Sequence, residues 1–319
     1  ATLGSVSDQI LTYQLKEATV GKQTAQEMIE ELRNFDTPSI TNIVATYPNN
    51  PLCLGLYNPW TQDWYTDQTI RCMYPELGPV VGYAVTAVYG LPDPSFGRLS
   101  FMDVLEALDA SPRPTVFVYE QQFPPEIAGK VGLSGGNMTS ALKAVGCVGA
   151  ISNGPSRDID EIRPMNFQYL LSGITPGHGN MAIHAVNVPV TVGGMDVAPG
   201  DIIHMDENGA VKFPADKLEA VLTNVTQLRD QEAERMGAMA QAGSLEEVRA
   251  TLDTTRKRAF ASLERQAERA LRVEVPPEPD YDEIEDAAKR RLAYFDSFHA
   301  MRDVHLGAML PAALTEKTS

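Results

Sequence analysis

Strand-like and helix-like segments alternate between residues 31 and 214. The strand-like segments are rich in β-branched and small apolar residues and lie at residues 80–88, 116–119 and 147–152. The helix-like segments lie at residues 102–108 and 138–145. Gly146 follows the second of these, where a glycine commonly ends a helix. The alternation predicts an α/β sandwich, with helices covering a sheet.

The pattern becomes purely helical on both sides of this region. Residues 1–30 interleave apolar with polar residues, which predicts an N-terminal helical arm. Residues 215–319 repeat apolar positions at helical spacing, and Ser244 with Glu247 forms a capping-box pattern. We therefore divide the chain into an arm (1–30), an α/β core (31–214) and a helical extension (215–319). The extension is expected to pack on the core or on a neighbouring subunit; a dedicated partner-binding module is the alternative.

Charge and cysteine content narrow the function classes. With 26 Lys and Arg against 42 Asp and Glu, the net charge is −16, which argues against nucleic acid or an anionic membrane as the main partner. The three cysteines show no C-x-x-C spacing, which makes a disulfide framework or a structural zinc site improbable. No signal-peptide pattern opens the sequence, and no apolar run is long enough to span a bilayer. We expect a soluble, cytoplasmic protein.

A glycine pair precedes the second helix-like segment. Gly135 and Gly136 lead through Asn137 and Met138 into that helix, so several backbone N–H groups at its start have no partner within the helix. These groups and the helix dipole form an anion site for a carboxylate or phosphate. The glycines let a ligand approach the backbone closely.

Arg157 and Asp158 follow the strand-like segment at 147–152. Ligands in open α/β folds bind beyond the carboxyl ends of strands, which would place this pair beside the anion site. Asp158 suits Mg²⁺, which often takes one or two protein carboxylates, and Arg157 can hold a carboxylate or a developing enolate oxygen. The pair therefore suits a metal-assisted reaction on a 2-oxo acid. The alternative is a structural ion pair in a turn.

Residues 138–158 resemble the RraA-like family, which includes metal-dependent 4-hydroxy-4-methyl-2-oxoglutarate aldolases and regulators of ribonuclease activity. Further stretches fit the family pattern in the same order, and the resemblance covers roughly residues 31–214. They lie at residues 35–39, 81–86, 159–163, 173–179, 187–190, 192–194 and 199–211.

The resemblance implies a β/β/α sandwich of the swivelling-domain type, usually a homotrimer with sites between subunits. In the aldolases, the Arg that corresponds to Arg157 binds the oxo acid and supports the enolate, and the Asp that corresponds to Asp158 holds Mg²⁺ or Mn²⁺. The amides of the loop Gly135, Gly136, Asn137 and Met138 would bind the pyruvate carboxylate.

The sequence departs from the aldolases at one position. They carry an acidic residue twenty-one positions before the Arg, where this chain has Gly136. A glycine has no side chain to act as a base or hold a water molecule. Asp160 or Glu161 could take over this role, although each is also typical of an exposed helix start. Glu120, Glu126 or an acid from the appended helices are further alternatives.

Other candidate residues each have a structural alternative. His178, between two glycines, could touch a ligand or stabilise a turn, and His204 with Asp206 could face a cleft or form a hydrogen-bonded turn. Cys147 begins an apolar strand and is expected to be buried and inert. The aromatic residues within 57–65 could line a pocket or an interface, or pack in the core; they are Tyr57, Trp60, Trp64 and Tyr65.

These observations favour a divalent-metal-dependent carbon–carbon lyase acting on a small 2-oxo acid. Retro-aldol cleavage and decarboxylation share an enolate intermediate, and the missing acid at Gly136 tilts the prediction towards decarboxylation or another lyase or hydratase reaction. The main alternative is a non-catalytic trimeric binding or regulatory protein of the ribonuclease-regulator type. A third possibility is altered chemistry on a larger substrate, in which the aromatic loop at 57–65 forms one wall of the substrate site and sets its specificity.

Overall fold

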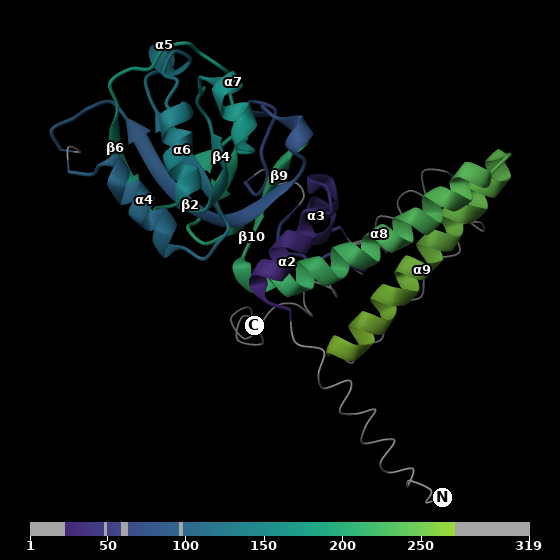
Figure 1. Ribbon diagram of the computed structural model, residues 1–319. Helices are drawn as coiled ribbons and strands as arrows, with labels where there is room; N and C mark the ends of the chain where they lie inside the picture. Colours follow the sequence, from purple (N-terminus) through teal and green to yellow (C-terminus); the bar gives the residue numbers. More distant parts are fainter. Residues whose placement is uncertain (1–22, 48–49, 59–62, 96–97, 272–319) are drawn as a thin grey trace, which may run out of the picture.

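A mixed eight-stranded sheet organises the α/β part of the chain (Figure 1). The computed structural model describes residues 23–47, 50–58, 63–95 and 98–271. The strands are β1 (Arg71–Cys72), β2 (Val80–Gly90), β3 (Thr115–Gln122), β4 (Cys147–Ser152), β5 (Gln168–Leu171), β6 (Ala182–Val186), β7 (Val190–Val192), β8 (Met195–Val197), β9 (Ile202–Asp206) and β10 (Gly209–Phe213).

The helices lie mainly on one face of the sheet and at one end of it. The α-helices are α2 (Ala25–Leu32), α3 (Thr37–Val44), α4 (Phe101–Ala110), α5 (Pro125–Ala128), α6 (Gly136–Ala144), α7 (Ile159–Ile162), α8 (Leu218–Gln241) and α9 (Leu245–Leu271). Short 3₁₀ helices are η1 (Pro75–Leu77), η2 (Arg163–Met165) and η3 (Ala215–Lys217).

Strands β2, β3, β4 and β5 are parallel neighbours, and the connections that join them contain α4, α6 and α7 in turn. Parallel strands require such crossovers, because a short hairpin cannot return the chain in the same direction. The sheet order is β1-β5-β4-β3-β2-β9-β10, with β6 also pairing with β2. The crossovers bring the starts of α6 and α7 to the edge where β4 ends.

Alternate residues of β2 face two different layers. Val85 and Tyr89 pack with Leu108 of α4 and Leu142 of α6. Ala84 and Val88 point to the opposite face, and the antiparallel β7–β8 ribbon packs in the same cluster. Side chains alternate across a strand, so one strand supplies both cores. The predicted α/β fold, with a layer of helices, a central sheet and a second β layer, is confirmed.

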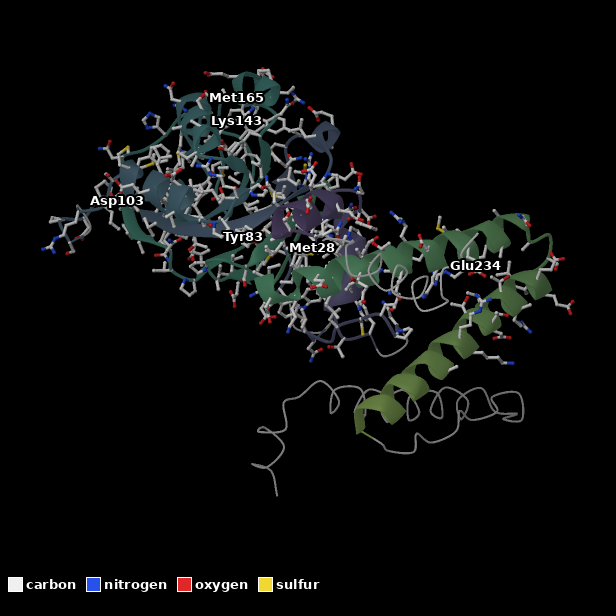
Figure 2. The ribbon with its side chains drawn as sticks, turned by 60° about the horizontal axis from the view of Figure 1, so that its bottom comes forward. Met28, Tyr83, Asp103, Lys143, Met165 and Glu234 are labelled. Carbon is white, nitrogen blue, oxygen red and sulfur yellow. The ribbon has the colours of Figure 1, made fainter. Side chains whose placement is uncertain are left out.

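A third cluster joins α8 to the end of the sheet. The first turns of α8 bury a helical stripe against α2, α3 and strands β9 and β10; the stripe consists of Leu218, Val221, Leu222, Val225 and Leu228. The rest of α8 carries no buried residue and projects from the core with α9 beside it (Figures 1 and 2). Figure 2 labels Met28 next to the anchored end and Glu234 on the projecting part.

The helical flanks follow the predicted pattern where they are described. The turn before α9 carries half of the predicted capping box: the Glu247 amide donates to Ser244 Oγ at 3.2 Å, and the Glu247 carboxylate accepts from Gly243. Helix α2 spans the boundary expected between residues 30 and 31. Most of the arm and the helix expected around residues 284–298 lie outside the described residues. Within the described ranges, no helix has the length and hydropathy needed to cross a bilayer.

We predict that Leu222→Ala lowers the free energy of unfolding by about 2–5 kcal/mol, because it leaves a cavity under α8. The matched control is Leu252→Ala on α9, where the side chain is 49% exposed and the loss should stay within about 0.5 kcal/mol. Urea denaturation followed by circular dichroism measures both. Equal effects would show that α8 is not anchored in this way.

His204 generates a pH prediction. It is fully buried on β9, its Nε2 donates to the Leu32 carbonyl at 3.2 Å, and its Nδ1 accepts from Thr37 Oγ1 at 2.9 Å. Burial lowers the pKa of His204 below its ordinary value of about 6.5. Below pH 6.5, His204 therefore binds a proton more readily in the unfolded chain than in the folded chain. The contribution of neutral His204 to the free energy of unfolding is complete above pH 6.5 and is lost as the pH falls towards the folded-state pKa.

Wild-type stability should therefore fall below pH 6.5 with a slope of up to about 1.4 kcal/mol per pH unit from this residue. His204→Gln should flatten that slope, whereas Leu252→Ala, which changes no titrating group, should keep it. Urea denaturation midpoints measured between pH ~7 and ~5 give the slope for each of the three proteins. A wild-type slope retained in His204→Gln would refute the assignment.

Candidate functional site

A cleft of about 470 Å³ opens where α6 begins, beyond the carboxyl end of β4. Its lining includes every residue that the sequence singled out for the oxo-acid site: Gly135, Gly136, Asn137, Met138, Arg157 and Asp158. Leu133, Glu161, His178 and Met181 complete the lining. The fold thus brings together the loop before α6, the turn after β4, the start of α7 and the segment before β6.

Asp158 closes the N-terminus of α6. No side chain of the helix itself caps this end, and the Gly136 amide donates to Asp158 Oδ2 at 3.2 Å. The contact puts a negative charge at the positive end of the helix dipole. Asn137 and Met138 of the first turn line the same cleft, and the N-terminus of a helix is a favourable place for an anionic ligand.

The backbone of Asp158 is held in a left-handed conformation. Its φ is 57° and its ψ is 36°, which costs a residue with a side chain roughly 1 kcal/mol or more. The loop is fixed on both sides: the Arg157 amide donates to the Ser134 carbonyl at 3.1 Å, and Ser156 Oγ donates to the same carbonyl. The strained turn brings the Asp158 carboxylate to the start of α6, although the residue stays exposed to solvent.

Gly135 is needed for the approach of Arg157 and Asp158. A Cβ atom at this position would lie 2.4 Å from Asp158 Oδ2 and 3.0 Å from Arg157 Nε. The two side chains are an ion pair, with Arg157 Nε 3.4 Å from Asp158 Oδ2, and each is one-third exposed, at 33%. Their charges are thus partly desolvated yet open to a small ligand.

Gly136 makes room for the Glu161 carboxylate. A Cβ atom on Gly136 would lie 2.4 Å from both Cδ and Oε1 of Glu161. Glu161 sits on α7, three residues after Asp158, and its amide donates to the Asp158 carbonyl at 3.0 Å. Glu161 is exposed, as expected for a residue at a helix start, and it also borders the cleft.

The other acidic alternatives lie elsewhere. Asp160 and Glu126 do not line the cleft, and Glu120 accepts hydrogen bonds from Thr191 and Gln122. Of the acids considered from the sequence, Glu161 alone joins Asp158 in the cleft within the described part of the chain. Acids beyond residue 271 lie outside that part.

Helices α6 and α7 are joined at their far side as well. Lys143 near the end of α6 donates to the carbonyl of Met165 in η2, and Figure 2 labels the two residues next to each other. Tyr169 of β5 contacts Thr139 of α6 and Ser134 before it, each at 2.9 Å between oxygens. These contacts fix the two walls of the cleft relative to each other.

The donor groups of the cleft fit Mg²⁺ or Mn²⁺ better than zinc. In residues 23–271, apart from the short gaps, no three or more His, Cys, Asp or Glu side chains converge as a metal site. Zinc sites usually need three or four such ligands, whereas Mg²⁺ takes one or two carboxylates and fills its remaining positions with water and substrate. Asp158, with Glu161 nearby, meets the second requirement.

Of the remaining candidates, one borders the cleft and three are buried. His178 borders the cleft, and its Nδ1 lies 3.3 Å from the Gly179 carbonyl; a histidine between two glycines was the only sequence signal for it. His204 is a buried structural residue, and Asp206 accepts from the amides of Thr37 and Asn208 at 2.7 Å. Cys147 is buried as predicted, which raises the pKa of its thiol to about 11.

The aromatic loop does not wall the cleft in the described residues. Trp64 is buried, stacks on Tyr57 with ring centroids 5.3 Å apart, and packs with α3 and β10. Trp60 lies outside the described residues. The core-packing alternative therefore holds for Tyr57 and Trp64.

Comparison with known proteins agrees with the geometry of the core. A 174-residue match to the protein DlpA of Legionella pneumophila is 27% identical and covers 53% of this chain and 27% of that protein. A 91-residue match to a putative 4-hydroxy-4-methyl-2-oxoglutarate aldolase of Halalkalibacterium halodurans is 31% identical and covers 28% of this chain and 43% of that protein. The chain thus spans less than half the length of either relative.

Among solved structures, the RraAS2 protein of Streptomyces coelicolor, described as an unusual member of the RNase ES inhibitor RraA family, superposes with a TM-score of 0.50. The two share 19% identity, over 68% of this chain and 98% of that one, which is evidence for a common fold. The family model for RraA-like proteins, described as Aldolase/RraA, matches residues 58–212. Residues 58–212, which form most of the α/β core and its cleft, are therefore similar to the RraA-like family.

Proposed function

We propose that this protein is a divalent-metal-dependent carbon–carbon lyase that acts on a small 2-oxo acid. The observation that carries the proposal is the convergence of Arg157, Asp158 and the N-terminus of α6 on one cleft of an RraA-like domain. This set of groups matches a 2-oxo acid, which carries a carboxylate and a neighbouring carbonyl that becomes negatively charged as its carbon–carbon bond breaks.

The binding roles follow from charge and position. Backbone amides at the start of α6 receive the substrate carboxylate, and the Arg157 guanidinium donates to that carboxylate or to the developing enolate oxygen. Asp158 would hold Mg²⁺ or Mn²⁺, which would supply Lewis-acid polarisation of the keto group. In the structure, Asp158 accepts a hydrogen bond from the Gly136 amide, and that amide would be open to the substrate if the carboxylate turned to a cation.

Glu161 supplies the proton-transfer step. In retro-aldol cleavage, a base removes the proton of the 4-hydroxyl group, the C3–C4 bond breaks, and the electron pair passes to the C2 carbonyl as an enolate. The protonated base then gives its proton to C3, which yields pyruvate, and C4 is released as a carbonyl group. The Glu161 carboxylate borders the cleft beside Gly136, where it can take the first proton. With Glu161 present, retro-aldol cleavage is favoured over decarboxylation, which needs no such base.

A trimeric binding or regulatory protein is the second candidate. The projecting part of α8 and α9 favours it, because this exposed surface is available to a partner. The Streptomyces coelicolor relative is described as belonging to a family of RNase ES inhibitors. On either candidate we propose a homotrimer, in which a neighbouring subunit covers part of the cleft.

We predict that metal-stripped protein binds oxalate, an enolate mimic, only after Mg²⁺ or Mn²⁺ is added. Asp158→Ala should weaken that binding by more than about tenfold, because it removes the metal ligand. The matched control is Asp160→Ala, an exposed acid two residues away that does not line the cleft and should bind as wild type does. Isothermal calorimetry measures all three proteins. Undiminished oxalate binding in Asp158→Ala would overturn the metal assignment.

We predict that Glu161→Gln lowers kcat on 4-hydroxy-4-methyl-2-oxoglutarate by about 10²–10⁴-fold and changes oxalate affinity little. Gly136→Asp combined with Glu161→Ala should recover at least about tenfold of the loss, because it places an acid in the vacated volume. Asp160→Asn is the control. Pyruvate release gives the rates, and oxaloacetate decarboxylation assayed in parallel should be less sensitive. Full activity in Glu161→Gln would exclude this carboxylate as the base.

A further inference from the structure

A second cavity of about 460 Å³ adjoins the cleft. The two share Asn137, Met138 and Met181 as a common wall. The other residues of this cavity come from β2, α4, the segment before α4 and β6: Tyr89, Leu99, Ser100, Phe101, Ala182 and Ile183. We call it the apolar chamber. Its volume lies in the range of small-molecule sites, and the shared residues place it directly beside the cleft.

The lining of the apolar chamber differs in chemistry from that of the cleft. Among the described residues, no Asp, Glu, Lys or Arg lines the chamber, whereas Arg157, Asp158 and Glu161 line the cleft. Ser100 is engaged, because its hydroxyl donates to Asp103 at 2.8 Å as part of the α4 cap. The shared wall consists of Asn137 and two methionines, whose flexible thioether chains adapt to ligands of different shape. The chamber therefore suits an apolar group and repels an anionic one.

Tyr89 brings an aromatic ring to this lining. It is 3% exposed at the end of β2, and its ring meets Tyr119 edge to face with centroids 5.9 Å apart. Its hydroxyl oxygen is buried, so it does not face the open chamber. Phe101 adds a second ring to the same lining. Aromatic rings pack favourably edge to face or offset against other aromatic rings.

We propose that the apolar chamber binds the part of the substrate beyond its 2-oxo acid head, and that this part is an aromatic ring, which would pack against the rings of Tyr89 and Phe101. The inference rests on the proposed function and adds the substrate class: 4-aryl-4-hydroxy-2-oxobutanoates. Glu161 takes the 4-hydroxyl proton, the C3–C4 bond breaks, C3 gains a proton, and the products are pyruvate and an aryl aldehyde. The carboxylate head stays at α6 and the aldehyde forms in the chamber.

Binding tests the chamber without turnover. The probes are 2-oxo-4-phenylbutanoate and its 4-hydroxyphenyl analogue, which lack the 4-hydroxyl group and cannot undergo retro-aldol cleavage, with 2-oxobutanoate as the reference. We expect each aryl probe to bind at least about tenfold more tightly than 2-oxobutanoate in the presence of Mg²⁺. Ala182→Phe, which fills the chamber, should abolish this gain, whereas Ala198→Phe, exposed and outside both cavities, should keep it.

Tyr89→Phe is a control for the ring contact, because it keeps the aromatic ring and removes only the buried hydroxyl. It should bind both aryl probes as wild type does. Calorimetry gives these affinities. Pyruvate release gives the rates for two substrates: 4-hydroxy-2-oxo-4-phenylbutanoate and 4-hydroxy-2-oxopentanoate, which carries a methyl group in place of the phenyl ring. The kcat/KM ratio should favour the aryl substrate by about tenfold or more in wild type and fall to about one in Ala182→Phe.

The outcomes separate this inference from the proposed function. The protein could cleave both substrates with equal kcat/KM and bind the aryl and alkyl probes equally. That result would overturn the proposed role of the apolar chamber and would support the proposed lyase activity. Tighter aryl binding that Ala182→Phe abolishes, without cleavage of either substrate, would support the chamber and overturn the lyase. Retention of the aryl preference in Ala182→Phe would show that the ring binds elsewhere and would also overturn the inference.

Discussion

The hydrogen bond from the Gly136 amide to the Asp158 carboxylate joins the start of α6 to the turn after β4. Three features of the chain make it possible. The parallel strands carry both segments to the same edge of the sheet, the left-handed backbone of Asp158 brings its carboxylate to the start of α6, and Gly135 leaves room for that side chain. An alanine at residue 135 would place a Cβ within 2.4 Å of the carboxylate.

Much of this arrangement could be predicted from the sequence. The alternation of segments predicts the crossovers, and the rule that ligands bind beyond strand ends places Arg157 and Asp158 beside the glycine pair. The cleft then follows from topology, because local signals specify each element and the parallel sheet specifies which ends meet. The paired faces of β2 could be expected too, since an almost continuous apolar run suits a strand covered on both sides.

The role of Glu161 could not be ranked from the sequence. Asp160 and Glu161 are both acidic residues of the same helical turn, and only the direction of each side chain separates them. That direction depends on how α7 packs beside α6, which is a tertiary property. The same holds for the apolar chamber, since its walls come from residues 89, 99–101, 137–138 and 181–183, distant in sequence. His178 likewise enters the cleft through the path of an irregular segment that carries no periodic signal.

We propose that the cleft generates and protonates the enolate of a 2-oxo acid. Exchange of the C3 protons of pyruvate with deuterium, followed by proton NMR in D₂O, measures enolate formation and needs no knowledge of the natural substrate. We expect exchange by the wild-type protein with Mg²⁺ or Mn²⁺, and its loss in Asp158→Ala and Glu161→Gln but not in Asp160→Asn. Absence of exchange at every metal concentration in protein that binds oxalate would show that the cleft does not form the enolate.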